Sequence, residues 1–367
     1  MRLKLNLAIA LLATGVSTMA AARPAFVVGT GGGASPAQVR IYDADGQPLR
    51  TITPAVGVGG GVHVASGDLN GDGVAEIVTG ADSGGGPRVR VFDGVTGNAV
   101  RDFFAYDAAF QGGVRVATGD LNGDGAADIV TGAGPGGGPH VKVFSGKDGA
   151  VLASLFAFDA AFMGGVNVAV GDFGGDGRAD LIVGAGPGGG PRVRILTGTD
   201  NNVQHDFFAF DTSFLGGVSL ATGRYQGQNA LYVGAGENGG GQVKVFSLSD
   251  GGLLAAFTAF EPGFAGALSL GFAQVAGRDT LLVGTATRGG RIGLLDVGGR
   301  GRGAQNEAEF SYLTPFGADY MDGLSVAGVA AAVPEPASWA LMIAGFGLAG
   351  TTARRRLRSD HRSVNPA

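Results

Sequence analysis

The stretch VRVATGDLNGDGAADIVTGAGPGGGPHVKVF, residues 114–144, contains the pattern that decides the fold. Its Gly-Asp-Leu-Asn-Gly-Asp-Gly phrase at residues 119–125 also occurs at residues 67–73 and, with changes, at residues 171–177, and both steps are 52 residues long. Four short apolar runs recur around this phrase in a fixed order, separated by turns rich in Gly, Asn, Asp and Pro. Runs of this kind are typical of β-strands. Four strands in a repeat of this length predict one blade of a β-propeller.

The number of repeats predicts six blades. Five complete units begin, each with its first run, at Val62, Val114, Val166, Val218 and Leu268. The N-terminal part supplies only the last three runs of a unit (residues 26–29, 39–42 and 49–53), and the C-terminal part supplies a lone first run at residues 324–329. We therefore expect an all-β, six-bladed propeller of four-stranded antiparallel blades. The C-terminal strand would complete the N-terminal blade and remove the open sheet edges.

Three short motifs give the repeat a family resemblance. They are Gly112-Gly113 before the first run, the Asp-x-Asn-x-Asp-Gly loop after it, and Gly132-Ala133-Gly134 after the second run. The repeat resembles the FG-GAP/VCBS family, whose repeats also build the propeller of integrin α-subunits. The resemblance extends over roughly residues 26–330. Because the integrin propeller has seven blades, seven is the alternative to the six counted here.

Composition independently supports this fold class. The 367 residues include 72 Gly, 22 Phe and no Cys, and 45% of them are hydrophobic. Each Gly in a helix interior costs about 1 kcal/mol relative to Ala, which disfavours long helices. The apolar share argues against disorder, and the absence of Cys excludes a disulfide scaffold and Cys-ligated zinc.

Residues 1–22 have the features of a secretory signal peptide, with a buried N-terminal helix as the alternative. Arg2 and Lys4 precede an apolar stretch, and Ala20-Ala21-Ala22 offers a small-residue cleavage site. Without this segment and the chain after Pro336, 19 Lys and Arg remain against 30 Asp and Glu, a net charge of −11. Such an acidic body argues against a nucleic-acid partner and is compatible with divalent cations.

The C-terminal part predicts a second sorting signal. Pro334-Glu335-Pro336 is followed by Trp339, an apolar run at residues 340–353 and Arg354-Arg355-Arg356. The run is shorter than the roughly 20 residues of a comfortable membrane span. This order of parts resembles the PEP-CTERM sorting signal of Gram-negative bacteria. The resemblance implies an exosortase-like enzyme that removes the tail, after the apolar helix has lain transiently in the inner membrane, so that the protein is exported and released or re-attached at the cell surface.

The expected division of the chain follows from these segments. Residues 1–22 would be the signal peptide and residues 23–332 the propeller. Residues 333–358 would be the sorting segment and residues 359–367 a disordered tail. An ordinary C-terminal membrane anchor is the alternative to the sorting segment.

The Asp-rich loop between the first and second runs predicts a calcium site. Ca²⁺ takes six to eight oxygen ligands, and oxygen-bearing side chains at alternate positions of such a loop can share one ion. The predicted ligands, with residues 74, 126 and 178 acting through their carbonyls, are Asp68, Asn70, Asp72, Val74 and Glu76 in the first loop, Asp120, Asn122, Asp124, Ala126 and Asp128 in the second, and Asp172, Asp176, Arg178 and Asp180 in the third. We expect two ions and a weaker third, because Gly174 removes one ligand.

The same residues also favour metal-free Asx turns, which is the alternative interpretation of the loops. The fourth unit has lost the loop, since it is two residues shorter and Arg224 replaces the first Asp. We expect the Arg224 guanidinium to take the place of the missing cation.

Charged and aromatic residues recur once in each unit. Basic residues occupy the third run at Arg40, Arg90, Lys142, Arg194 and Lys244, and acids end the fourth run at Asp107, Asp159, Asp211 and Glu261. Cross-strand pairing within each blade is the simplest interpretation, and a charged ring that binds an anionic glycan is the alternative. The Phe-Ala-Phe or Phe-Ala-Tyr phrase of the fourth run predicts core between blades rather than a platform for a sugar.

Residues suited to catalysis are scarce. His63, His140 and His205 occupy different positions of the repeat, and no cluster of polar residues is found that breaks it. We therefore expect no enzyme but a monomeric, calcium-stabilised adhesion or binding protein of the cell surface or extracellular matrix. Its partner would be an extracellular glycan or a surface protein. The alternative is a propeller-fold hydrolase or lyase that acts on extracellular polysaccharide, because fold alone does not decide function.

Overall fold

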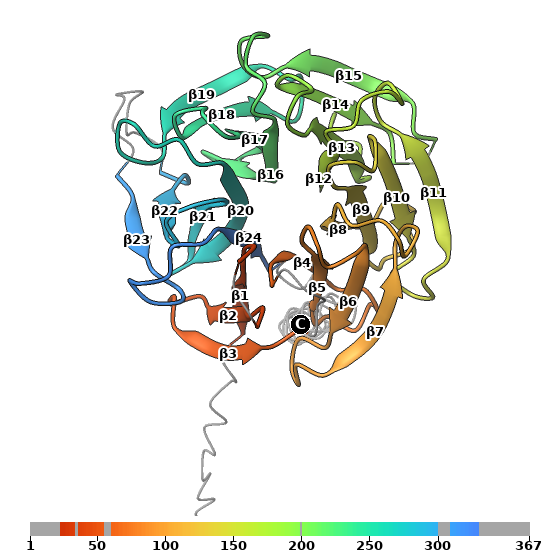
Figure 1. The fold of residues 1–367 in the computed structure, drawn as a ribbon, viewed down its shortest axis with the longest axis horizontal. Helices are drawn as coiled ribbons and strands as arrows, with labels where there is room; N and C mark the ends of the chain where they lie inside the picture. Colours follow the sequence, from red (N-terminus) through yellow and green to blue (C-terminus); the bar gives the residue numbers. More distant parts are fainter. Residues whose placement is uncertain (1–22, 34–35, 55–59, 199, 300–308, 330–367) are drawn as a thin grey trace, which may run out of the picture.

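Six four-stranded antiparallel sheets surround a central axis in the structure of the protein, a computed structural model (Figure 1). The structure describes residues 23–33, 36–54, 60–198, 200–299 and 309–329. The described residues contain 24 strands and no helix. The predicted all-β, six-bladed propeller is therefore confirmed, and the alternative of seven blades is wrong.

Every blade has the same order of strands from the axis outward. The innermost strands are β4 (Val62–Gly67), β8 (Val114–Gly119), β12 (Val166–Gly171), β16 (Val218–Tyr225), β20 (Leu268–Val275) and β24 (Leu324–Gly328). The second strands are β1 (Pro24–Thr30), β5 (Glu76–Ala81), β9 (Asp128–Ala133), β13 (Asp180–Ala185), β17 (Gln228–Ala235) and β21 (Arg278–Thr285). The third strands are β2 (Val39–Asp43), β6 (Arg88–Phe92), β10 (His140–Phe144), β14 (Arg192–Leu196), β18 (Gln242–Ser247) and β22 (Ile292–Asp296). The outermost strands are β3 (Pro48–Ile52), β7 (Ala99–Phe104), β11 (Val151–Phe156), β15 (Val203–Phe208), β19 (Leu253–Thr258) and β23 (Ser311–Leu313).

The first blade joins the two ends of the chain. Its sheet has the order β24-β1-β2-β3, and β24 pairs antiparallel with β1 from Phe26↔Gly328 to Thr30↔Leu324. The Val329 N–H then donates to the Ala25 carbonyl at 2.7 Å. The closure expected from the incomplete end units is confirmed, and the inner edge of β1 is covered.

The core lies between neighbouring blades. The second strands β5, β9 and β13 are buried along their whole length, since each has a strand on both sides and a blade against both faces. One cluster unites Tyr232 of β17 with Leu281 of β21, both of them 0% exposed. Blades approach so closely that a Cβ on Gly80 would lie 2.3 Å from the Val114 carbonyl oxygen of the next blade. This contact explains why a Gly recurs near the end of the second strand.

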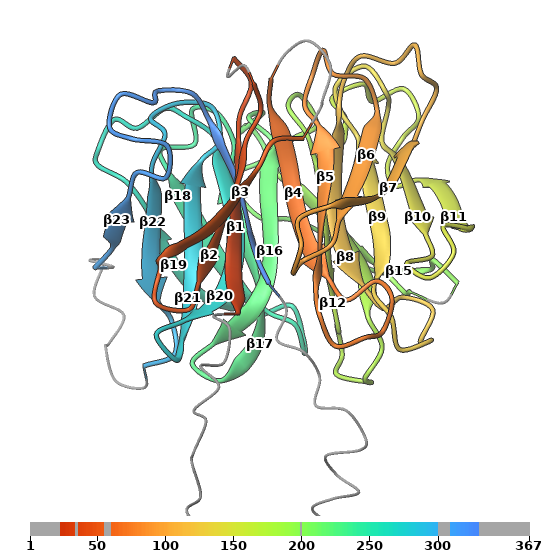
Figure 2. The same cartoon turned by 90° about the horizontal axis from the view of Figure 1, so that it is seen from below.

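The loops divide between two faces because the strands alternate in direction (Figure 2). The Asp-rich loops join the innermost to the second strands on one face, called here the Asp-loop face. The Gly-rich connections to the third strands lie on the opposite face, called the Gly-loop face. The strand β1 begins and β24 ends on the Asp-loop face, so the chain enters and leaves the propeller there.

Candidate functional site

The first Asp-rich loop is a series of turns closed by side-chain oxygens. The Asp68 carboxylate accepts the N–H groups of Gly71 (2.7 Å), Asp72 (3.1 Å) and Gly73 (2.8 Å). Asn70 Oδ1 accepts from the Asp72 N–H at 2.8 Å, and Asp72 Oδ1 accepts from the Val74 N–H at 2.8 Å. These are Asx turns, which Asn and Asp form readily.

Glu76 closes this loop from the start of β5. It is only 4% exposed, and its Oε2 accepts the Leu69 N–H at 2.9 Å. Asn70 Nδ2 lies 3.0 Å from Asp72 Oδ2 and 3.4 Å from Glu76 Oε1, so the amide faces both carboxylates. Burial raises the pKa of Glu76 to about 7, and the charges of Asp72, Asp68 and Asp93 add to this increase against the Leu69 hydrogen bond. The first loop is thus rich in negative charge.

The second loop repeats these contacts but adds a cation from the chain. Asp128 is fully buried and accepts the Leu121 N–H at 3.0 Å, and burial raises its pKa. Lys147 Nζ, from the turn between β10 and β11, donates to the Asp124 carbonyl at 2.7 Å and lies 3.2 Å from Asp124 Oδ1. The equivalent position beside the first loop, 52 residues earlier, is occupied by Val95, which is 62% exposed.

The third loop is weaker in oxygen ligands, as predicted from Gly174. Asp172 accepts the Asp176 N–H at 3.0 Å and Asp176 accepts the Arg178 N–H at 2.9 Å, but the third position carries no side chain. Asp180 is 4% exposed, accepts the Phe173 N–H at 2.8 Å, and has a pKa that burial raises.

The fourth and fifth units replace the loop by tight hairpins. Gln226-Gly227 and Ala276-Gly277 have positive φ of 52° and 84°, and of 50° and 70°, respectively, which suits the two-residue turns of hairpins. Arg224 is exposed within β16, and its carbonyl accepts the Tyr232 hydroxyl at 2.5 Å. The expectation that its guanidinium takes the place of the missing cation stays a prediction.

The oxygen donors of the first two loops suit a hard divalent cation chemically. In the part of the chain that the structure describes, however, no three His, Asp or Glu side chains are grouped so as to hold a metal ion. The carboxylates are satisfied by backbone N–H groups and by the Asn70 and Asn122 amides. The arrangement is that of the Asx-turn alternative, and calcium at these loops stays a prediction.

A polar cluster on the Gly-loop face breaks the repeat. His63 Nε2 lies 3.5 Å from Asp82 Oδ1, and Arg115 Nη1 donates to the Gly112 carbonyl at 3.3 Å. Burial opposes ionisation of Asp82, but the neighbouring His63, the Ser83 N–H and the charge of Arg115 hold its pKa well below its usual range. Burial also lowers the pKa of Arg115, against the charge of Asp82.

Sequence reasoning missed this cluster because Arg115 comes from the repeat after the one that contains His63 and Asp82. The signal was present, since Asp82 occupies the position of Gly134 in the next repeat. His63 Nε2 is buried and has no hydrogen-bond partner among the described residues. The side chains of His63 and Asp82 are 27% and 25% exposed, so the cluster is partly open to solvent.

The recurring basic residues do not pair with the recurring acids. Four of the five instead lie over aromatic rings of the preceding blade's outer connection, whereas Arg90 lies over Phe92 of its own strand and pairs with Asp102 at 3.1 Å. The distances to the ring centroids are 5.0 Å for Arg40 over Phe316, 5.5 Å for Lys142 over Tyr106, 5.3 Å for Arg194 over Phe158 and 5.2 Å for Lys244 over Phe210. Asp107, Asp159 and Asp211 accept backbone N–H groups of their own turns. The predicted cross-strand pairing with these acids is wrong, because the acids lie in the connection to the next blade.

The Phe-Ala-Phe phrase is core only in part. Its central Ala is buried, as Ala105 and Ala157 show, and its last aromatic lies under the basic residue just described. Its first Phe lies at the rim: Phe104, Phe156 and Phe208 are 54%, 55% and 51% exposed. For these three residues the prediction of core between blades is wrong, since no neighbouring blade covers the outer end of the strand.

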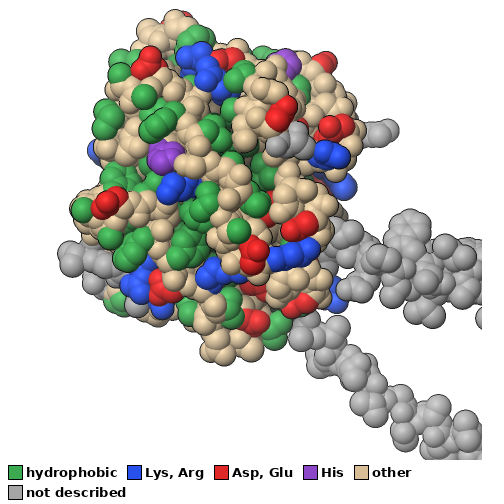
Figure 3. Space-filling model, turned by 90° about the vertical axis from the view of Figure 1, so that its right-hand side faces the viewer, with side chains coloured by type: hydrophobic (Ala, Val, Ile, Leu, Met, Phe, Trp, Pro, Cys, Tyr) green, Lys and Arg blue, Asp and Glu red, His purple; other side chains and the backbone are tan. Residues whose placement is uncertain are grey.

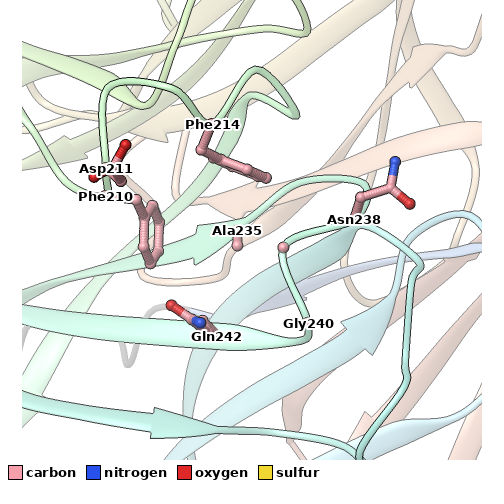
Figure 4. Close-up of a pocket in the computed structure, with 8 residues that line it drawn as sticks. Phe210, Asp211, Phe214, Ala235, Asn238, Gly240 and Gln242 are labelled. Atoms are coloured by element: carbon pink, nitrogen blue, oxygen red, sulfur yellow. The ribbon is translucent and has the colours of Figure 1, made fainter.

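A shallow pocket of about 290 Å³ lies on the Gly-loop face between the fourth and fifth blades (Figure 4). Phe210, Phe214, Asn238 and Gln242 contribute to its walls. Asp211 is its only titratable group, and its carboxylate accepts the Ser213 N–H at 2.9 Å and the Ser213 hydroxyl at 2.6 Å. The pocket thus offers no acid–base pair.

Comparison with protein families agrees with the repeat and the tail. Residues 60–99 match the FG-GAP repeat and residues 120–183 match the FG-GAP-like repeat. Residues 332–356 match the PEP-CTERM protein-sorting motif. The chain carries FG-GAP repeats and a PEP-CTERM sorting motif. The motif at the C-terminal part supports export of the propeller.

Comparison with curated proteins found no relative of this chain. Among solved structures, the chain is similar to "Structure of U3-55K", with 15% identity over 79% of this chain and 75% of the other, and a TM-score of 0.45. It is also similar to "Crystal structure of RRP9 WD40 repeats", with 15% identity over 80% and 74% of the two chains and a TM-score of 0.44.

The predicted terminal segments lie outside the described residues. These are the signal peptide at residues 1–22, the sorting segment at residues 333–358 and the tail at residues 359–367. Among the residues that are described, no helix is long and apolar enough to cross a membrane. The helix expected at residues 340–353 lies outside the described residues.

Proposed function

We propose that this FG-GAP propeller is a calcium-stabilised binding or adhesion protein of the cell surface or extracellular matrix. The observation that carries the proposal is the closed ring in which the start of β1 and the end of β24 both lie on the Asp-loop face. Because the chain leaves the ring there toward its sorting motif, the Gly-loop face and the rim stay available to a partner. An exosortase-like enzyme would process the tail, and the released or re-attached domain would be a monomer.

Calcium would stabilise the Asp-loop face by balancing its negative charge. In the first loop Asp68, Asn70, Asp72, the Val74 carbonyl and Glu76 would hold the ion. The supporting observations are the oxygen-only donors, the buried Glu76 and Asp128 carboxylates and the net charge of −11 without the two ends. Affinity on the order of 10⁻⁴–10⁻³ M is typical of extracellular modules. Binding only to the folded state would raise stability by mass action.

An experiment with residues 23–332 tests this function, because every strand partner of the ring lies within that range. The labelled domain is added to native cells that lack the gene, with calcium or with a chelator. We expect saturable adsorption, and a melting temperature that rises with calcium. Adsorption that never saturates would contradict the binding role, and a melting temperature indifferent to calcium and chelator would contradict the metal assignment.

The second candidate function is a hydrolase or lyase acting on extracellular polysaccharide. The observation that favours it is the cluster of His63, Asp82 and Arg115, since catalytic sites often contain titratable groups with strongly shifted pKa values. The burial of His63 Nε2 opposes it. Release of new reducing ends from the host's polysaccharide by the wild-type domain, and not by His63→Ala, would establish the enzyme and overturn the binding proposal.

A further inference from the structure

Three consecutive outer strands expose one aromatic ring each. Phe104 of β7, Phe156 of β11 and Phe208 of β15 occupy the same repeat position, and each is more than half exposed. The third Gly of the neighbouring Gly-rich turn leaves the ring uncovered. For example, Gly138 has a φ of 68°, and a Cβ on it would lie 3.6 Å from Phe156 Cε1. In Figure 1 these strands follow one another along the right-hand side of the ring.

Each ring is accompanied by a polar pair on the same blade. Arg88 is the cross-strand partner of Phe104, and its guanidinium holds Asp102 with hydrogen bonds of 2.8 and 2.6 Å. Arg192, the partner of Phe208, holds Asp206 with two hydrogen bonds of 2.6 Å. We call each ring with its polar pair a rim platform.

In the platform of the middle blade, His140 and Ser154 take the places of the Arg and Asp of the other two platforms. His140 Nε2 lies 2.9 Å from the Ser154 hydroxyl, and the His140 and Phe156 ring centroids are 4.9 Å apart. All three platforms therefore combine an open aromatic face with hydrogen-bonding groups at its edge.

The other three blades lack the platform although they share the fold. Thr258 is the cross-strand partner of Gln242, in the register that joins Arg88 to Phe104. In the other two blades the paired residues are Val39↔Ile52 and Ile292↔Leu313. The next residue along each outer strand, Thr53 or Thr314, therefore occupies the repeat position of Phe104. Because the blades with Thr at these positions adopt the same four-stranded fold, the three Phe are not needed for folding.

We propose that the three rim platforms bind an extended polysaccharide of uncharged pyranose rings, a proposal that rests on the proposed role as an extracellular binding protein. A pyranose ring has an apolar face of C–H groups that can stack on an aromatic ring. Its hydroxyls donate to a carboxylate and accept from a guanidinium at the edge of that face. Similar platforms on successive blades match a ligand made of repeating units, and simultaneous engagement raises the overall affinity.

Charge and surface pattern favour this ligand over others. Asp102 and Asp206 each face two guanidiniums, those of Arg88 with Arg90 and of Arg192 with Arg194. The net charge of −11 without the two ends nevertheless opposes an anionic polymer. Figure 3, which faces this side of the ring, shows hydrophobic side chains interspersed with charged ones. A stable contact with a second copy needs about 800 Å² per partner with a well-packed core, which favours one continuous apolar patch over separate rings.

Affinity electrophoresis of residues 23–332 tests the proposal. The domain is run through gels that contain a soluble neutral β-glucan, acidic polygalacturonate, or no polymer. We expect retardation in the neutral gel, weak or absent retardation in the acidic gel, and a loss of affinity of at least tenfold in Phe104→Thr/Phe156→Thr/Phe208→Thr. This variant installs the residue that the other three blades carry.

A matched control removes equally exposed apolar side chains from the Gly-loop face. Met163, Leu215 and Met321 are 54%, 58% and 67% exposed, and their triple Thr variant should be retarded like the wild type. Equal retardation of both triple variants, or no retardation of the wild type in the neutral gel, overturns the proposal. A wild-type dimer in sedimentation that the Phe variant abolishes would assign the rim to a second copy instead. If the Phe variant still adsorbs to host cells, the proposed binding function is retained and the role of the rim platforms is wrong.

Discussion

Lys147 Nζ lies 2.7 Å from the carbonyl oxygen of Asp124 and 3.2 Å from its Oδ1. The lysine thus brings a positive charge to the second Asp-rich loop. The first loop has Val95 at the equivalent position and has the additional acid Asp93 near Glu76. If calcium binds these loops, the two should therefore differ in affinity although their side-chain ligands differ only at Glu76 and Asp128.

Exchanging the two residues tests this difference. Val95→Lys should weaken calcium binding at the first loop about tenfold and Lys147→Val should strengthen it at the second about tenfold, since one charge near a divalent ion changes its energy by roughly 1–2 kcal/mol. Isothermal titration calorimetry of residues 23–332 measures both affinities. Val95→Gln is the control for side-chain size. Wild-type calcium affinities that neither exchange alters would show that the lysine does not act on the ion.

Closure of the ring predicts that the monomeric state of the domain depends on the last strand, β24. A chain that ends at residue 323 lacks β24 and exposes the edge of β1, from Phe26 to Thr30, to other molecules. We expect this truncation to form large oligomers in size-exclusion chromatography, whereas a chain that ends at residue 329 stays monomeric. If the chain that ends at residue 323 is monomeric and folded, the closing strand is dispensable.

The charged pair around Asp206 predicts a pH-dependent contribution to stability. Burial opposes its ionisation, but Arg192 and Arg194 hold the pKa of Asp206 below its ordinary value of 3.8. A lowered carboxyl pKa stabilises the fold above the unfolded value, and this stabilisation is lost as pH falls through the folded value. Asp206→Asn should thus lower the free energy of unfolding by about 1 kcal/mol at pH 7, and the difference should vanish near pH 2.

Urea unfolding at the two pH values gives this measurement. Asp159→Asn is the matched control, because the Asp159 carboxylate accepts the Ala161 N–H and has no ion pair in the described part of the chain. A deficit of Asp206→Asn that stays constant from pH 7 to pH 2 would mean that its ionisation is not the source of the stability.

The closure shows how much of this fold can be predicted from sequence. The incomplete units at the two ends contain complementary runs, and residue order alone therefore places residues 324–329 beside residues 26–29. The repeat also locates the Asp-rich loops and explains why the third is weaker at Gly174. These features depend on local patterns that recur every 52 residues.

Contacts between blades were not predictable in the same way. Lys142 lies over Tyr106 and not beside Asp159, because the register between two blades is set by packing and leaves no mark within one repeat. The alternation of apolar residues in β7 does not reveal that Phe104 has no blade outside it. Comparison of Phe104 with Thr258 at the same repeat position would have indicated exposure, since a buried position rarely accepts both.

The central claim is that the propeller is exported and that its tail serves as a sorting signal. Intact mass spectrometry of the protein isolated from its native host tests this most directly. The account predicts a mature chain that lacks residues 1–22 and the Arg354–Arg356 cluster, with a C-terminus near Pro334-Glu335-Pro336. A mature chain that still contains Arg354, Arg355 and Arg356 would contradict it and would make the tail an ordinary anchor.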